Sequence, residues 1–263
     1  MKDFESQPRE ISFSDHLVES NISSAHEGRD KLFEIRNNPD KIVRMESFKD
    51  LEKRYKGAID PIAVAELGQK LYAEFERDYG VVVPVEFVIG KHGRNKDVIY
   101  GITDKIEGAD LNKIEPTPEI TEQVEKLYAK IARYYLSKLS KKDEPYLADL
   151  NNTTQYVYGK RKGDEIPKIY LVDTDLYIRS EKFALYNVVV WLFRHMSSAE
   201  KKYGTEFTEA RDVIQQILDA PLPDYISEKE ESVIRGIIEK MRGYLEGSIR
   251  IDDEDAHPLF SHL

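Results

Sequence analysis

The chain has 263 residues, of which 40% are hydrophobic and 33% are charged, and its formal net charge at pH 7 is −10. This length allows one large domain or two lobes that share a cleft, with enough apolar residues to bury a core. The acidic balance argues against a general binder of nucleic acids or of anionic membranes. The chain contains no cysteine, which excludes disulfides, thiolate metal sites and cysteine nucleophiles.

The N-terminal residues are polar and lack the apolar core of a signal peptide. The most apolar later stretch, residues 183–193, is too short to span a bilayer. We therefore expect a cytoplasmic protein with no membrane partner. Residues 1–20 show no clear periodicity, and we expect them to form a flexible extension.

The part of the chain that follows this extension contains runs of β-branched and aromatic residues, which predict strands. The first two runs flank Asn37-Asn38-Pro39-Asp40, whose residue types favour a hairpin turn. The next two runs are joined by a polar loop, which predicts a second hairpin. These strands cover residues 31–35, 41–45, 81–89 and 98–106.

Helical spacing separates the two hairpins. Asp60 suits the N-cap of this helix, Pro61 suits its first position, and Gly80 suits its end. After the second hairpin helical patterns predominate, interrupted by a third hairpin with strands near residues 155–158 and 169–172. The predicted helices cover residues 60–79, 117–139, 182–196, 206–218 and 228–246.

The strongest chemical signal is an apolar strand, residues 169–172, that leads into two carboxylates at Asp173 and Asp175. A strand that presents acids at its C-terminal end is one way to hold a divalent cation over a phosphate. Another acid, Asp149, lies in a polar loop soon after the 117–139 helix. A helix, a loop acid and then a strand ending in an acid is the order of parts in a kinase-like phosphotransfer site.

This order of elements resembles the protein-kinase-like fold, including its small-molecule, aminoglycoside-type branch, over almost the whole chain. The resemblance implies an α+β, bilobal protein in which a small antiparallel sheet with one helix precedes a mainly helical lobe. It implies an N-lobe over residues 21–108 and a C-lobe over residues 109–263, after the extension at residues 1–20. A nucleotide would bind in the cleft between the lobes.

The resemblance also implies catalytic and metal-binding roles. Asp149 would orient the hydroxyl group of the acceptor and accept its proton. Asp173 would hold Mg²⁺ against the phosphates of ATP, with Asn152 or Gln155 supplying a neutral oxygen ligand. The acceptor itself is not identified by these residues.

Further roles concern the nucleotide. Residues 107–111 resemble the hinge between the lobes, where the backbone around Glu107 and Ala109 would receive the adenine. Arg44 stands at the position of the family's phosphate-binding lysine. A glutamate on the 60–79 helix would pair with Arg44, either Glu66 or Glu74.

The chain departs from the family pattern in several places. Residues 23–29 offer one glycine in place of a glycine-rich loop, and Arg44 replaces a lysine with a different reach and hydration. Leu147 replaces a histidine, and Thr154 stands where the family has an asparagine. Two interpretations follow: an ATP-dependent kinase acting on a small-molecule or protein hydroxyl, and a pseudokinase or scaffold that binds a protein partner.

A third interpretation starts from the Asp173-Thr174-Asp175 motif alone, which resembles the Asp-x-Asp motif of nucleotide-sugar glycosyltransferases. Those enzymes usually precede the motif with alternating strands and helices, whereas a hairpin-rich region and a long helix precede it here. A Walker A loop, a G-x-S-x-G motif and histidines at metal-ligand spacing are all absent from the sequence. P-loop, serine hydrolase and histidine-based metal sites therefore lack support.

Overall fold

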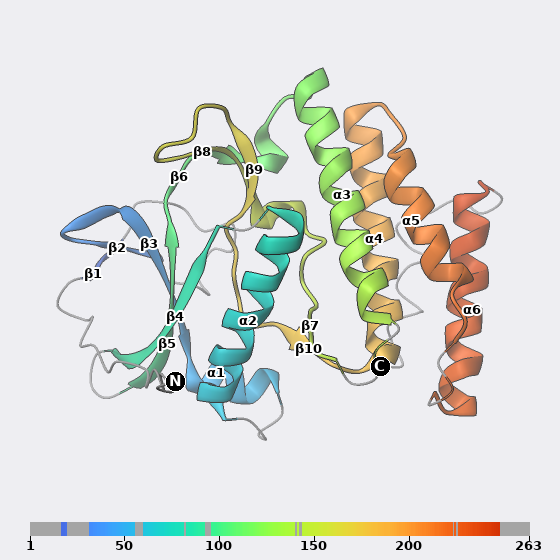
Figure 1. Ribbon diagram of the computed structural model, residues 1–263, viewed down its shortest axis with the longest axis horizontal. Coiled ribbons are helices and arrows are strands. Elements are labelled where there is room, and N and C mark those ends of the chain that lie inside the picture. Colours follow the sequence, from blue (N-terminus) through green and yellow to red (C-terminus); the bar gives the residue numbers. More distant parts are fainter. Residues whose placement is uncertain are drawn as a thin grey trace, which may run out of the picture. The chain divides into compact units, whose positions relative to one another are not determined.

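The structure is a computed structural model that describes residues 17–19, 32–55, 60–81, 83–92, 96–139, 141, 144–222, 224 and 226–247. These residues form an α+β fold of antiparallel sheets and helices (Figure 1). The chain divides into two compact units. Unit 1 contains residues 1–114 and 153–178, and unit 2 contains residues 115–152 and 179–263.

The sequence predicted a single division of the chain near residue 108. The first change of unit, after Ile114, lies six residues further on. Residues 153–178 belong to unit 1 in this division, whereas the prediction included them in the helical lobe. Most of the predicted extension over residues 1–20, and all of residues 23–29, lie outside the described residues.

Unit 1 is built on an antiparallel sheet. Its described strands, in spatial order, are β1 (Leu17–Glu19), β2 (Leu32–Ile35), β3 (Asn38–Ser47), β5 (Lys96–Asp104) and β4 (Val85–His92). The two predicted hairpins, β2–β3 and β4–β5, are confirmed. β3 begins inside the predicted turn, and the β2–β3 register shifts between Glu34 and Ile35. β4 begins only after Pro84, which has no N–H group to donate to a neighbouring strand.

Alternate residues of β3 face opposite sides of this sheet. One side carries a core cluster of Phe33, Val43, Val98 and Tyr100. Arg44, the residue after Val43, therefore faces the other side, where it lies opposite Gly101 of β5. Arg44 therefore carries its positive charge on the side of the sheet opposite to this cluster.

The helix α2 (Pro61–Tyr79) confirms the predicted caps. The Asp60 side chain accepts a hydrogen bond from the Ile62 N–H at 3.0 Å, and Gly80 ends the helix at a φ of 65°. Gln69 fixes the helix to β4, because its side chain donates to the Val85 carbonyl and accepts from the Phe87 N–H. A short helix that the sequence did not predict, α1 (Phe48–Arg54), follows β3 and is capped by Ser47.

A second antiparallel sheet in unit 1 contains β6 (Ile106–Asp110), β8 (Tyr156–Arg161) and β9 (Lys168–Leu171), in that order. The β8–β9 hairpin was predicted, and β6 covers most of residues 107–111, which the sequence analysis compared with a hinge. Gly108 lies opposite Gly159, and a Cβ atom on Gly108 would lie 2.2 Å from the Tyr158 carbonyl oxygen. Glycine therefore allows a close strand pair here. Short 3₁₀ turns, η1 (Leu111–Lys113) and η2 (Thr153–Gln155), follow β6 and precede β8.

Ion pairs join the two sheets of unit 1. Asp104, at the end of β5, accepts from Lys41 of β3 at 2.6 Å and lies 3.8 Å from Arg161 of β8. Lys162, at the tip of the β8–β9 hairpin, pairs with Asp40 of β3 at 2.5 Å. The hairpin is thus fastened to the larger sheet at the end of β5 and near the start of β3.

Unit 2 is mainly helical. Its described helices are α3 (Pro118–Leu139), α4 (Lys182–Tyr203), α5 (Thr208–Asp219) and α6 (Glu228–Leu245). α3 packs against α4 and α5, and α6 packs against the same two helices (Figure 1). The four helices confirm the predicted ones, although α4 continues to Tyr203 through polar residues that the prediction had excluded. Two-residue strands, β7 (Tyr146–Leu147) and β10 (Ile178–Arg179), complete the described elements.

A buried carboxylate fastens α4 to α5. The side chain of Glu200 is 8% exposed and accepts a hydrogen bond from the Phe207 N–H at 2.7 Å. The Arg211 guanidinium donates to both of its oxygens, each at 2.7 Å. Such a bidentate pair is a strong, geometrically defined contact, so Glu200 fixes the turn between the two helices.

Candidate functional site

The acids predicted to bind metal lie in residues 172–178, which we call the acid segment. Residues 172–177 leave β9 without forming a regular element, and β10 begins at Ile178. The Val172 and Asp173 N–H groups both donate to the Gln155 carbonyl, at 2.9 and 3.3 Å. These hydrogen bonds fix the start of the acid segment to the turn η2.

Asp173 forms an ion pair with Arg44 of β3. The two side chains are 14% and 15% exposed, so both charges are largely removed from solvent. Thr174, the next residue, lies close to Gly101, because a Cβ atom placed on that glycine would be 3.8 Å from the threonine Oγ1. The acid segment therefore runs along the side of the sheet to which Arg44 points.

A second arginine continues this pattern. Arg54, at the end of α1, lies 2.6 Å from the Glu46 carboxylate and 3.9 Å from that of Asp175. Glu46 follows Arg44 by two residues on β3, so both side chains lie on the same side of the sheet. We call Arg44, Glu46, Arg54, Asp173 and Asp175 the charge ladder. It contains three carboxylates and two guanidinium groups.

Tyrosine hydroxyl groups hold the backbone of the acid segment. The Tyr55 hydroxyl donates to the Leu176 carbonyl and accepts from the Ile178 N–H, the latter at 2.8 Å. The Tyr72 hydroxyl of α2 donates to the Asp175 carbonyl at 2.7 Å. Burial raises the pKa of Tyr55 above its usual value, so its hydroxyl stays protonated and available as a donor.

Close packing against α2 also holds this segment. A Cβ atom on Gly68 would lie 2.2 Å from Leu176 Cδ2, and the Leu176 side chain is 1% exposed. A larger residue at this position of α2 would require the buried Leu176 side chain to shift. The acid segment is therefore positioned by the helix as well as by its hydrogen bonds.

The neutral ligand predicted for a metal ion, Gln155, is 3% exposed. Within the described part of the chain, its Oε1 atom is buried and has no hydrogen-bond partner. A buried carbonyl oxygen without a partner is costly. Gln155 is next to Asp173 through the backbone hydrogen bond at 3.3 Å, and an amide oxygen and a carboxylate are both of the ligand types that hard cations accept.

The remaining residues predicted to bind nucleotide lie on α2 and β6. Glu66 is exposed on α2, whereas Glu74 on the same helix is half-buried. The ion pair described for Arg44 is with Asp173. Glu107 and Ala109 are exposed on β6, an edge strand of its sheet as described.

The other predicted residues belong to unit 2. Asp149 and Asn152 are both half-buried in the loop that follows β7. Between them, Leu150 and Asn151 are buried, and the Asn151 side chain donates to the Val188 carbonyl of α4 at 3.5 Å. Leu147, at the position of the family's histidine, is 1% exposed and offers no polar group.

Sequence reasoning missed several residues that hold the acids. Glu46, Arg54, Tyr55 and Tyr72 carried no motif, and they reach the acid segment from positions more than 100 residues earlier in the chain. Their one visible signal is the pair of opposite charges at Arg44, on a predicted strand, and Glu46, directly after that strand.

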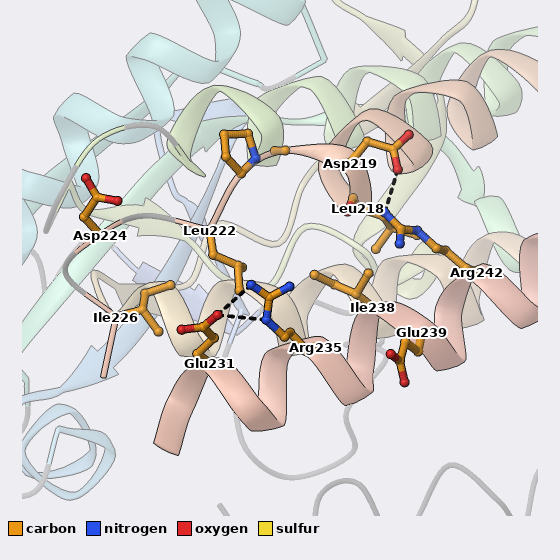
Figure 2. A pocket seen from close by; sticks show the side chains of 12 residues that line it. Leu218, Asp219, Leu222, Asp224, Ile226, Glu231, Arg235, Ile238, Glu239 and Arg242 are labelled. Atoms are coloured by element: carbon orange, nitrogen blue, oxygen red, sulfur yellow. Dashed lines mark hydrogen bonds and ion pairs between the residues drawn. The ribbon is translucent and has the colours of Figure 1, made fainter. Parts of the chain in front are cut away.

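A separate hollow of about 690 Å³ lies in unit 2, around the turn between α5 and α6 (Figure 2). Its lining includes Arg235 and Arg242, and each guanidinium is paired with an acid. Arg235 contacts Glu231 at 2.6 Å, and Arg242 contacts Asp219 at 2.7 Å and the Leu218 carbonyl at 3.0 Å. The Arg242 contacts join the end of α5 to α6, whereas the Arg235–Glu231 pair lies within α6.

Two kinds of feature are absent from the residues that the structure describes. They contain no group of three or more histidine, cysteine, aspartate and glutamate side chains that could hold a metal ion. None of the helices that the structure describes has the length and apolarity needed to cross a bilayer.

Comparisons with known proteins add no family. The chain matches no protein-family model, and no curated protein matches it significantly. The charge ladder and the acid segment are therefore the features of this chain from which a function can be argued.

Proposed function

We propose that the chain is a divergent kinase-like, ATP-binding phosphotransferase with a bilobal arrangement, which transfers a phosphoryl group to a small-molecule or protein hydroxyl with Mg²⁺. The observation that carries this proposal is the Arg44–Asp173 ion pair. A guanidinium group can bind phosphate oxygens through two donors, and a carboxylate is a preferred ligand of Mg²⁺. The pair thus offers a positive group for phosphate oxygens and a negative group for a metal ion.

In this proposal ATP supplies the phosphoryl group and Mg²⁺ supplies positive charge next to it. Arg44 holds phosphate oxygens, and Asp173 holds the metal together with the Oε1 atom of Gln155 or with Asn152. Asp149 orients the acceptor hydroxyl and takes its proton. The exposed edge of β6, at Glu107 and Ala109, receives the adenine.

A second candidate is a pseudokinase or scaffold that binds nucleotide without transferring phosphate and serves a protein partner. The buried Leu147 favours it, because no polar side chain stands at this position to support Asp149. The two candidates share the role of Asp173 in metal binding and differ in the role of Asp149. Binding and turnover therefore have to be measured separately.

The test is a thermal-shift titration with ATP, alone and with Mg²⁺, and with UDP-glucose and Mn²⁺. Wild type is compared with Asp173→Asn and with Asp212→Asn, which removes an exposed carboxylate of α5. A ligand that binds only the folded protein at about 100 times its Kd adds about 2.7 kcal/mol of stability. We expect Mg²⁺–ATP to stabilise wild type and Asp212→Asn, but not Asp173→Asn.

Each outcome separates the candidates. Stabilisation by Mg²⁺–ATP, followed by Asp149-dependent consumption of ATP with a hydroxyl acceptor, supports the phosphotransferase. Stabilisation without any turnover supports the pseudokinase. A response only to UDP-glucose with Mn²⁺ supports the glycosyltransferase interpretation, and no response to any nucleotide overturns the proposal.

A further inference from the structure

We propose that the hollow between α5 and α6 binds an aliphatic polyamine, at a site separate from the residues proposed for phosphoryl transfer. The hollow is formed by the end of α5, the described part of the connection that follows it and one side of α6 (Figure 2). Its volume of about 690 Å³ lies within the range of about 300–1,000 Å³ that is usual for small-molecule pockets. None of the residues named in the proposed function lines this hollow, so the inference goes beyond that function.

One wall of the hollow is a regular helix. The start of α6 is fixed by a capping box, in which Ser227 accepts from the Glu230 N–H and Glu230 accepts from the Ser227 N–H. The residues of α6 that line the hollow follow the spacing of one side of a helix. They are Glu231, Arg235, Ile238, Glu239 and Arg242. This side of α6 therefore presents charged groups on both sides of an apolar residue.

The charges that line the hollow do not balance. Four carboxylates and two guanidinium groups lie there, which gives a formal charge of −2 at pH 7. Each arginine already contacts one carboxylate, because Arg235 lies 2.6 Å from Glu231 and Arg242 lies 2.7 Å from Asp219. Hydrogen bonds from Gln215 and Arg242 lower the pKa of Asp219, so this acid stays ionised. The arginines are thus neutralised by two of the four acids.

The other two carboxylates, Asp224 and Glu239, supply the charges for a ligand. The ion pairs found within the described part of the chain include neither of them, and both are exposed to solvent. In Figure 2 the side chains of Leu222, Ile226 and Ile238 lie between these two acids. The hollow therefore offers two separated negative charges with apolar side chains between them.

A ligand that matches this arrangement carries two positive charges joined by an apolar chain. Aliphatic polyamines have this form, because methylene groups separate ammonium groups that are protonated at pH 7. Their ammonium groups contact Asp224 and Glu239, and their methylene groups cover the apolar side chains between the two. A metal ion fits less well, since it has no apolar part and the described residues contain no group of three or more side chains that could hold one.

The first arm of the test identifies the class of ligand by isothermal titration calorimetry. The probes are spermidine, putrescine, butylamine and Mg²⁺. Butylamine has an apolar chain but one ammonium group, whereas Mg²⁺ has two charges and no apolar chain. We expect spermidine and putrescine to bind at least about 3-fold more tightly than either of these, and added salt to weaken their binding.

The second arm locates the site with variants that each remove one charge. Asp224→Asn and Glu239→Gln should each weaken spermidine binding about 3-fold, as expected for an exposed ion pair, and the double variant about 10-fold. Asp212→Asn removes an exposed carboxylate of α5 that does not line the hollow, and it should bind like wild type. Arg235→Gln should bind spermidine about 3-fold more tightly, because it releases Glu231.

The third arm tests the apolar part of the hollow. Leu222→Ala should weaken spermidine binding about 3-fold and leave the binding of Mg²⁺ unchanged, because only the polyamine places methylene groups on this side chain. Its matched control is Val233→Ala, which shortens an exposed apolar residue of α6 outside the lining. Circular dichroism establishes that each variant is folded.

The outcomes separate a built site from general attraction to an acidic chain. A loss in Asp212→Asn as large as that in Asp224→Asn would show that the net charge of −10 attracts polyamines without a site, and would overturn the proposal. Equal binding of spermidine and Mg²⁺, or no measurable binding of spermidine, would overturn it too. Binding that is lost in Asp149→Asn but kept in both hollow variants would overturn the inference and leave the proposed function standing. Hollow-dependent binding of spermidine by a chain that responds to no nucleotide would support the inference and overturn that function.

Discussion

Each unit contains a partly buried pair of an arginine and an acid. In unit 2, Arg211 and Glu200 are 11 residues apart in the chain and close the turn between two helices. In unit 1, Arg44 and Asp173 are 129 residues apart and join a strand to a segment without regular structure. In unit 2 both oxygens of the carboxylate accept from one arginine, and a backbone N–H adds a further donor. In unit 1 the carboxylates of the charge ladder outnumber the guanidinium groups.

This difference concerns how many contacts hold each carboxylate. Glu200 accepts three hydrogen bonds, two from Arg211 and one from the Phe207 N–H, and all of them join α4 to the start of α5. The contact described for Asp173 joins one of its oxygens to one nitrogen of Arg44. The same two residue types thus form a local pair with several hydrogen bonds in unit 2 and a long-range pair in unit 1.

The largest expected loss of stability follows from breaking the Glu200–Arg211 pair of unit 2. Replacing Glu200 by Ala leaves Arg211 and the Phe207 N–H without their buried partner, which should lower the free energy of unfolding by about 3 kcal/mol. Trp191 is the sole tryptophan and lies in α4, so its fluorescence in urea reports on unit 2. Asp212→Ala, at an exposed position of α5, should change the urea concentration at the midpoint of unfolding little. A loss below about 1 kcal/mol would contradict the saturated-pair description.

The next prediction tests how closely α2 packs against the acid segment. Gly68→Ala should destabilise unit 1 by about 1–3 kcal/mol, because the new methyl group would overlap Leu176. Its matched control is Gly236→Ala on α6, where no atom lies within 4 Å of the new Cβ and helix propensity should add about 0.5–1 kcal/mol. Hydrogen exchange measured by peptide identifies the unit affected. If both variants were stabilised alike, the packing of α2 on the acid segment would be wrong.

A smaller effect combines stability with pH. Tyr55→Phe removes a donor from the Leu176 carbonyl and an acceptor from the Ile178 N–H, at an expected cost of about 1–2 kcal/mol near neutral pH. Burial raises the pKa of Tyr55 above 10.0 in the folded protein, so above pH 10.0 the unfolded chain loses this proton first. Its contribution to stability is therefore complete below that pH and declines as the pH rises.

The measurement is the free energy of unfolding between pH 8 and pH 11, for wild type and Tyr55→Phe. The variant should show the shallower decline above pH 10.0. Other buried tyrosines affect both proteins equally and cancel in the difference. Parallel curves for the two proteins would show that the Tyr55 hydroxyl is not held as described.

The smallest expected change in the free energy of unfolding comes from an exposed ion pair of unit 2. Arg235→Gln removes an ion pair with Glu231 whose side chains are 64% and 40% exposed. Exposed pairs contribute little, so the free energy of unfolding should change by less than about 0.5 kcal/mol. Urea denaturation followed by Trp191 fluorescence tests this. A loss as large as that of Glu200→Ala would mean that burial does not separate the two kinds of pair.

The elements with clear ends were predictable from the sequence. The cap at Asp60, the proline after it and Gly80 mark α2, and Thr117 marks the start of α3. The elements that were missed lack such signals. α1 is short and mostly charged, and Leu51 is its one buried residue. β6 has the composition of a turn and forms a strand because β8 pairs with it.

The candidate site was predictable only in part, and the reason is distance along the chain. The resemblance to kinases placed Arg44 and Asp173 around the same phosphates, but nothing in the sequence shows that the two side chains form an ion pair. The partner expected for Arg44 was a glutamate of the 60–79 helix, because the resemblance implied one. The Tyr55 and Tyr72 hydroxyl groups donate to backbone carbonyls, which every residue has, so the sequence does not indicate where these hydrogen bonds form.

The path of the chain between the units bears on how the protein forms during synthesis. Unit 1 lacks its second sheet and the acid segment until residue 178 has left the ribosome, yet the chain in between belongs to unit 2. At about 5–20 residues per second, the first sheet, whose last strand ends at Asp104, waits roughly 4–15 s for the parts that complete unit 1. α3 waits in the same way for α4, α5 and α6. Neither unit can therefore be obtained by cutting the chain once, and neither can finish folding before synthesis of the other has begun.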